Sequence, residues 1–287
     1  MNVMKLRPFF LVFSTTLLLA SLFAIIFWRF KLSIDFTGGS TWDLNIPEYS
    51  EEKIKDVFSK NNLEIKEINS LGNQDYSLKF ADISTEQKNN LNLSLQEKFA
   101  NIKELKYESV GPVLGKELLQ KTIAAVILSS LFLFLFIGRR FKDLTFGASA
   151  ILAMFHDTFI LIGSFAIFGH FFGAQLDSLF VTALLTTLSS SVHDTVVTFD
   201  RIRELKRQHY QIDWVQLANQ AVTETLNRSI NNSMTIIFML TSLVLLGGLS
   251  TRWFATALLV GVICGTYSST GVAIPLVLFF KKHSKKK

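Results

Sequence analysis

Three ionisable residues lie within apolar segments of this 287-residue sequence, where an isolated charge is costly. Asp157 is near the centre of the segment AILAMFHDTFILIGSF, and Arg228 stands at the start of a later apolar segment. Asp194 follows a mostly apolar run that contains no charged residue after Asp177. A charged side chain in a bilayer usually faces the interior of a helix bundle and marks an ion or substrate path. We therefore take Asp157, Asp194 and Arg228 as candidate residues of an ion pathway.

Polar side chains accompany Asp194 and Arg228 at helical spacing, three, four and seven residues away. The face of Asp194 carries Thr187, Ser190 and Ser191. The face of Arg228 carries Thr225, Asn231, Asn232 and Thr235. The two segments are consecutive, hence antiparallel, and both polar stripes lie toward the same side of the membrane. A pairing of Asp194 with Arg228, directly or through water, is therefore geometrically reasonable.

Each of the three candidates also has a purely structural interpretation. Arg228 can extend to the lipid headgroups while its apolar stem stays in the bilayer. Asp157 has mostly apolar neighbours on its own face and can serve as a hydrogen-bond partner for an adjacent helix. The structural interpretation is weakest for Asp194, because its polar stripe favours a hydrated or protein-lined face.

The tripeptide His-Asp-Thr occurs twice, at 156–158 and 193–195. Each copy places a histidine directly before one of the candidate aspartates. Adjacent positions of a helix do not share a face, which argues against a metal site made by either pair. We expect no metal and no cofactor.

The sequence lacks the motifs of the enzymes that its membrane residues could suggest. Intramembrane aspartyl proteases carry Gly-x-Gly-Asp and Tyr-Asp, whereas this chain has Ser-Val-His-Asp and Phe-His-Asp. His-Glu-x-x-His and Gly-x-Ser-x-Gly are absent as well. The net charge of +6 comes from basic residues next to the ends of apolar segments, so nucleic acid is not an expected partner. The sequence indicates a protein that is not an enzyme.

The apolar residues that surround the candidates occur in blocks. Hydrophobic residues make up 49% of the chain, and a transmembrane helix needs about 20 mostly apolar residues. Six segments are long enough: residues 9–28, 121–138, 144–168, 177–199, 229–248 and 254–280. The sequence therefore predicts an α-helical polytopic membrane protein with six transmembrane helices, five of them within residues 121–280.

The distribution of Lys and Arg predicts the orientation of these helices. Basic residues flank the spans at residues 1–8, in the segment 200–228 and in the tail 281–287, whereas the short loops on the other side carry only Arg252. This bias places both termini in the cytoplasm. The first apolar segment is too long for a cleaved signal and has no A-x-A site, so we expect a retained anchor. Within 200–228, a helix that begins near Asp213 is expected to lead into the fifth span.

Residues 29–120 form a polar region of balanced charge, which we expect to fold outside the membrane. Alternating strand patterns and two amphipathic helices give the order βαββαβ, that of a ferredoxin-like fold. Ser84 and Gln87 have the spacing of a capping box, and Leu91, Leu95 and Phe99 follow at intervals of four. The single cysteine, Cys264, lies in the last apolar segment, so this domain has no disulfide. We interpret it as a binding or mechanical module.

Four motifs, IDFTGGS (34–40), GPVLGKEL (111–118), HDTVVTFDRIRE (193–204) and TLNRSINNSMT (225–235), resemble those of the SecF family. SecF is the smaller of the paired SecD and SecF membrane proteins that assist bacterial protein export. The resemblance implies half of a bundle of the resistance-nodulation-division (RND) type in the cytoplasmic (inner) membrane, with one domain on the periplasmic side. SecD, as a separate chain, would supply the other half. The Sec channel, unfolded preproteins and membrane lipid are the other implied partners.

The resemblance also implies roles for particular residues. The family's ion-pathway aspartate and arginine fall on Asp194 and Arg228. The pair would couple a proton gradient, or a sodium gradient, to late-stage preprotein translocation. His193 stands where the family usually has Asn, which adds a titratable neighbour to Asp194. Two other functions remain open: half of an RND-type exporter of small molecules or lipids, and a scaffold subunit that moves no ions.

Overall fold

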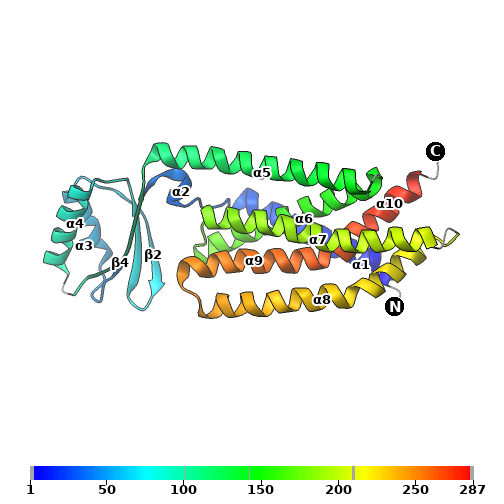
Figure 1. The fold of residues 1–287 in the computed structure, drawn as a ribbon. Coiled ribbons are helices and arrows are strands. Elements are labelled where there is room, and N and C mark those ends of the chain that lie inside the picture. Colours follow the sequence, from blue (N-terminus) through cyan, green and yellow to red (C-terminus); the bar gives the residue numbers. More distant parts are fainter. Residues whose placement is uncertain (1–2, 100, 142, 209–210, 285–287) are drawn as a thin grey trace. The chain divides into compact units, whose positions relative to one another are not determined.

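The computed structural model describes residues 3–99, 101–141, 143–208 and 211–284 (Figure 1). The chain separates into two compact units. The membrane unit comprises Met1–Lys31 and Ala125–Lys287, and the sheet unit comprises Leu32–Ala124. Each is described below by itself.

The membrane unit is built almost entirely of helices (Figure 1). Its elements are η1 (Val3–Leu6), α1 (Arg7–Phe27), the later part of α5 (Pro112–Phe141), α6 (Leu144–Phe172), α7 (Ser178–Gln208), α8 (Trp214–Leu246), α9 (Leu249–Ser268), the π-helical turn η2 (Ser269–Ala273) and α10 (Ile274–Ser284). In the described part of the segment 200–228, residues 200–208 form the end of α7 and residues 214–228 form the start of α8. Helix α8 continues without a break into the apolar segment.

Five of the described helices are long and apolar enough to cross a membrane, which makes the chain a multi-pass membrane protein. They cover Val3–Trp28, Pro112–Phe141, Leu144–Phe172, Trp214–Leu246 and Thr251–Lys282. The remaining predicted span, 177–199, lies in α7. Helix α7 is long enough, but its many Ser and Thr residues and its charged end keep it out of this group. The sixth span therefore stays a prediction.

Small residues allow α7 to pack closely against α9, and α6 against α1. A Cβ atom added to Gly261 of α9 would lie 2.0 Å from Cγ2 of Thr187 on α7. A Cβ atom at Gly163 of α6 would lie 2.2 Å from Cβ of Ser21 on α1. Interfaces of this kind are typical of membrane helices, in which glycine lets backbones approach. Thr187 is thus a packing residue, buried between α7 and α9.

The sheet unit has the predicted element order βαββαβ, preceded by the short helix α2 (Ile34–Thr37). The elements are β1 (Gly39–Asn45), α3 (Glu51–Lys60), β2 (Ile65–Gly72), β3 (Asp75–Phe80), α4 (Thr85–Lys98) and β4 (Lys103–Val110). The strands are antiparallel in the order β2-β3-β1-β4. Trp42 on the inner strand β1 lies opposite Leu78 of β3 and Tyr107 of β4.

The helices of the sheet unit are capped and buried as their sequences predict. Ser84 Oγ accepts a hydrogen bond from the Gln87 amide at 3.2 Å, and Gln87 Oε1 accepts one from the Ser84 amide at 3.0 Å. This confirms the capping box. Leu91, Leu95 and Phe99 are buried in a core with Trp42 and aromatic residues of α3 and β3.

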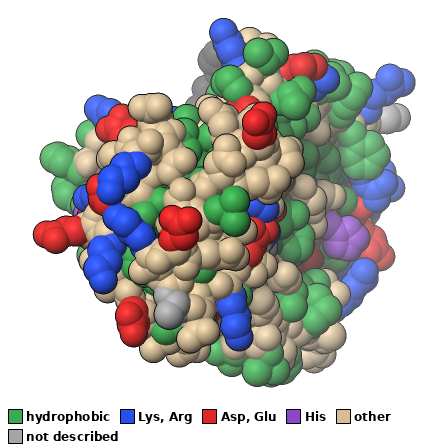
Figure 2. All heavy atoms as spheres, turned by 90° about the vertical axis from the view of Figure 1, so that its left-hand side faces the viewer, with side chains coloured by type: hydrophobic (Ala, Val, Ile, Leu, Met, Phe, Trp, Pro, Cys, Tyr) green, Lys and Arg blue, Asp and Glu red, His purple; other side chains and the backbone are tan. Residues whose placement is uncertain are grey.

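Basic and acidic side chains are interspersed on the face that Figure 2 turns toward the viewer. A surface for nucleic acid would be predominantly basic. This face therefore offers no support for a nucleic-acid partner.

Candidate functional site in the membrane unit

Asp194 of α7 and Arg228 of α8 line the same cavity. The cavity has a volume of about 170 Å³, and His193, Val197, Ser229 and Asn232 complete its wall. Asp194 is half-buried, whereas His193 and Arg228 are exposed. Within the described ranges, no hydrogen bond or ion pair joins the side chains of Asp194 and Arg228. The carboxylate and the guanidinium therefore face a common space without direct contact.

The polar residues predicted around these two have different surroundings in the structure. Only His193 and Asn232 line the cavity. Thr225 is drawn into the contact between α7 and α8, where its hydroxyl lies 3.3 Å from that of Thr198. Asn231 and Thr235 are exposed, and Ser190 is half-buried. Helical spacing thus located the cavity but overestimated the number of polar side chains that reach it.

Asp157 occupies a closed hydrogen-bond network in the interior of the bundle. Asp157 is 6% exposed. Ser191 Oγ of α7 donates to Asp157 Oδ2 at 2.6 Å, and Ser268 Oγ at the end of α9 donates to the same oxygen at 2.5 Å. The other carboxylate oxygen, Oδ1, lies 2.9 Å from Nδ1 of His156. Asp157 therefore links three helices.

The network extends to a fourth helix through His156, the residue before Asp157. Nε2 of His156 lies 2.5 Å from Oγ of Ser14 on α1, and all of these side chains are buried. Sequence spacing assigned Ser191 to the Asp194 stripe, but the structure directs its hydroxyl to Asp157. Sequence spacing did not reveal His156 and Ser268 as partners of Asp157, or Ser14 as the partner of His156. Adjacent positions of one helix argue against a metal site made by His156 and Asp157, but they do not prevent a hydrogen bond between the two side chains.

A π-helical turn borders this network. Ser268 is the last residue of α9, and η2 follows at once with Ser269, whose hydroxyl donates to the Thr266 carbonyl at 3.0 Å. π-Helical turns interrupt the regular helical hydrogen bonds and occur frequently at functional sites. Over the residues described, η2 is the only interruption in the long helical segment from α9 to α10. It lies where this segment contacts Asp157.

Ion pairs join the ends of α5, α7 and α8 beyond the apolar segments. Arg140 donates to Asp200 at 2.6 Å, and Arg201 pairs with Glu224 and Glu204. These pairs connect the segment 193–204 to its neighbours at one end of the bundle. No group of three or more His, Cys, Asp or Glu side chains with the geometry of a metal site occurs in the part of the chain that the structure describes.

Comparison with known proteins identifies the family. The model of the family "Protein export membrane protein SecD/SecF, C-terminal" matches residues 90–283. The protein translocase subunit SecF of Thermobaculum terrenum is 34% identical over 285 residues, which cover 93% of this chain and 90% of that protein. The chain belongs to the SecD/SecF family. The resemblance inferred from the four sequence motifs is thereby confirmed.

A solved structure of this family has the same fold as the chain. The crystal structure of SecDF from Thermus thermophilus, described as a translocon-associated membrane protein, matches with a TM-score of 0.87 at 29% identity. The match covers 98% of this chain and 39% of that one. In sequence, the SecDF protein of Thermus thermophilus is 33% identical, and 38% of its length is covered. The chain thus spans well under half of the fused relative.

Proposed function

We propose that the chain is a SecF subunit that works with a separate SecD chain to couple an ion gradient to late-stage preprotein translocation across the cytoplasmic membrane. Relatives that match over almost the whole chain are named protein translocase subunits, and none of those cited is named as an enzyme. The fused SecDF relative, of which this chain covers 38%, supports SecD as the partner. The Sec channel, unfolded preprotein and membrane lipid are the further partners proposed.

The topology proposed for this function has six spans, with α7 as the fourth, and both termini in the cytoplasm. The six spans form half of an RND-type bundle. Residues 29–120 lie on the periplasmic side as a ferredoxin-like domain, a proposal supported by the strand order β2-β3-β1-β4 and the antiparallel pairing. Helix α7 is polar for a span, but its Ser and Thr residues are compatible with a position inside a bundle, where such side chains bond to other helices.

The exposed polar face of α8 supports a partner in the membrane. Arg228, Asn231, Asn232 and Thr235 are all exposed in the isolated chain. Polar and charged side chains rarely face lipid, because their desolvation in hydrocarbon is costly. A second helical subunit against α8 would enclose these side chains, and we propose that SecD does so.

The cavity between α7 and α8 is the observation that carries the ion-coupling proposal. It places a half-buried carboxylate, Asp194, beside an exposed cation, Arg228, without a fixed bond between them. Burial favours the protonated form of a carboxyl group, whereas a nearby arginine favours the ionised form. A small movement between α7 and α8 can therefore change the charge of Asp194 and so drive uptake and release of an ion. Asp157, which lies in a closed network, is proposed as a secondary member of the path with a mainly structural role.

Protein export into inverted membrane vesicles tests this function. Vesicles that contain SecD and this chain should export a preprotein faster with an ion gradient than without one. Selective collapse of the proton or the sodium gradient identifies the coupling ion. Equal export under all conditions would favour a scaffold subunit. Purification without a Sec-channel partner, as a free homo-oligomer, would favour an exporter of small molecules or lipids.

A further inference from the structure

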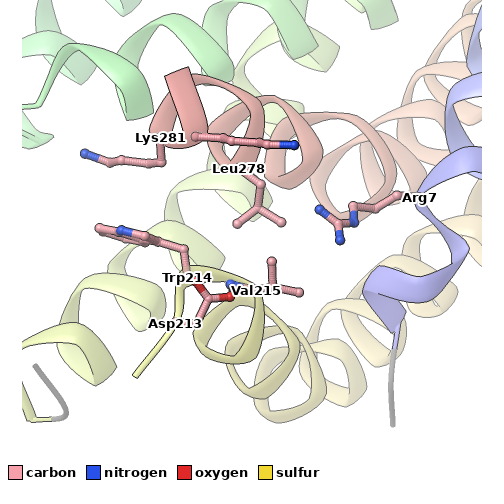
Figure 3. Close-up of a pocket in the computed structure, with 7 residues that line it drawn as sticks. Arg7, Asp213, Trp214, Val215, Leu278 and Lys281 are labelled. Atoms are coloured by element: carbon pink, nitrogen blue, oxygen red, sulfur yellow. Dashed lines mark hydrogen bonds between the residues drawn. The ribbon is translucent and has the colours of Figure 1, made fainter. Parts of the chain in front are cut away.

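A second cavity lies where α1 begins, α8 begins and α10 ends, and it has a volume of about 380 Å³ (Figure 3). Three cations line it: Arg7 from α1, and Lys281 and Lys282 from α10. Its wall also includes Trp214 and Val215 of α8. Because α1 begins and α10 ends here, the cavity lies at one end of the apolar segments of these two helices.

The floor of this cavity is apolar. Leu278 is 7% exposed, and Figure 3 shows Leu278 from α10 and Val215 from α8 pointing toward each other across the cavity. Arg7 reaches toward the same space from the start of α1 (Figure 3). The cavity thus combines an apolar floor with cationic walls, so it fits an amphipathic anion better than a freely soluble one.

Two of the three cations are available to a ligand. The ammonium group of Lys281 lies 2.5 Å from Asp143 Oδ2 and 5.0 Å from the centre of the Trp214 ring, so its charge is already partnered. Arg7 Nε donates to the Met4 carbonyl at 2.8 Å, which orients the guanidinium but leaves its charge uncompensated. Among the described residues, no carboxylate lies within ion-pair distance of Arg7 or Lys282.

The acidic residues at the cavity offset only part of this charge. Asp213 lines the cavity, and its Oδ2 accepts the Val215 amide at 3.1 Å as the N-cap of α8. Asp143 is engaged by Lys281 and by the Thr145 amide at 3.0 Å. Burial raises the pKa of the Asp143 carboxyl, but the hydrogen bonds from Lys281 and Thr145 outweigh it and bring the pKa below its usual value. Both carboxylates therefore have fixed roles within the protein.

We propose that this cavity binds the phosphate of an anionic phospholipid headgroup. A guanidinium offers paired N–H donors that match phosphate oxygens, and an ammonium adds a second point charge. Tryptophan is enriched at the membrane interface, and basic pockets between membrane helices bind anionic headgroups. A lipid supplies both parts that the cavity accommodates: the phosphate for Arg7 and Lys282, and an apolar portion for Leu278 and Val215.

The test uses the full chain in neutral detergent and counts bound lipid by native mass spectrometry. Phosphatidylglycerol, phosphatidylcholine and inorganic phosphate are added separately at equal concentration. Phosphatidylglycerol should be bound about tenfold more than phosphatidylcholine, and excess inorganic phosphate should not displace it. Arg7→Gln and Lys282→Gln should each weaken phosphatidylglycerol binding about fivefold.

Lys5→Gln is the matched control, because it removes the same charge two residues from Arg7 at an exposed position that does not line the cavity. It should leave binding unchanged. An equal loss of phosphatidylglycerol binding in Lys5→Gln and in the cavity variants would show that the lipid is attracted to basic surface residues in general. This result would overturn the proposal. Equal binding of the two lipids by the unaltered chain, or displacement by inorganic phosphate, would also overturn it, and neither result depends on the folding of a variant.

Discussion

The tripeptide His-Asp-Thr stands in α6 and again in α7, and the two copies have opposite environments. In α6, His156 and Asp157 are buried, and their polar atoms are engaged by serines of three other helices. In α7, His193 is exposed, and Asp194 is half-buried at a cavity that it shares with Arg228. The residue types alone do not decide what an aspartate in a membrane helix does. Its access to water and the number of its fixed partners decide it.

This difference separates two functions that a buried carboxylate can have. A network with every hydrogen bond satisfied holds helices in one arrangement and resists a change of charge. A carboxylate without a fixed partner, next to an exposed cation, can change its charge at lower cost. On this basis we propose the coupling role for Asp194 and the structural role for Asp157.

The largest expected contrast between the two sites is in chemical reactivity. A carbodiimide modifies carboxyl groups that are protonated and accessible. In a single wild-type sample, Asp194 should be modified at least about tenfold more than Asp157, since one opens to a cavity and the other is bonded on both oxygens. Mass spectrometry of the two peptides measures the ratio. Equal modification would mean that the interior network opens as readily as the cavity.

Replacement of Arg228 should impair the same step as loss of Asp194. Arg228→Ala should remove most gradient-stimulated export, and the double variant with Asp194→Asn should be little worse than either single variant, because residues that act as a unit are not additive. Initial rates of export into vesicles give the comparison. Arg252→Ala is the control, because it removes a cation from another part of the membrane unit. This variant should retain the stimulation of export by the gradient. Additive losses would show that Arg228 acts independently of Asp194.

Loss of Asp157 should mainly reduce stability. Asp157→Ala should lower the free energy of unfolding by about 2–4 kcal/mol, because His156 and two serine hydroxyls lose their acceptor in the bundle interior. Asp194→Ala, the matched control, should change it by less than about 0.5 kcal/mol. Unfolding in detergent monitored by circular dichroism measures both. The account of the closed network fails if the two variants are equally stable.

The smallest effect concerns two adjacent serines of α7. Ser191→Ala should cost about 0.6–1 kcal/mol, because Ser191 is buried and donates to Asp157. Ser190→Ala, at a half-buried position, should cost less than about 0.3 kcal/mol. The same unfolding measurement compares them. A reversed order would place Ser190, and not Ser191, in the network.

Much of the fold follows from local patterns. The apolar blocks predicted six spans, and five of them correspond to helices that are long and apolar enough to cross a membrane. Alternation and capping predicted the element order and the capping box of the sheet unit. Spacing on α7 and α8 also favoured a pairing of Asp194 with Arg228, and the two residues line one cavity. These features depend on residues close in sequence or on the antiparallel course of consecutive helices, so the sequence contains them directly.

The Asp157 network depends on contacts between distant segments, and helical spacing could not reveal it. At 100° per residue, Ser191 lies about 60° to one side of Asp194 and Ser190 about 40° to the other. Spacing therefore grouped both serines with Asp194, although Ser191 points to α6. One signal was available. Gly261 and Gly265, four residues apart, indicate a close helix contact, and they bring α9 with Ser268 against α7.

Export driven by an ion gradient tests the central assignment most directly when Asp194→Asn and Asp157→Asn are compared side by side. Inverted vesicles with SecD and each variant are assayed with and without the gradient, at equal amounts of folded protein. Asparagine keeps the size of aspartate but lacks an oxygen that titrates. We predict that Asp194→Asn loses the gradient-dependent part of export and that Asp157→Asn keeps most of it. Full stimulation in Asp194→Asn together with its loss in Asp157→Asn would contradict the assignment and place the coupling carboxylate in the interior network.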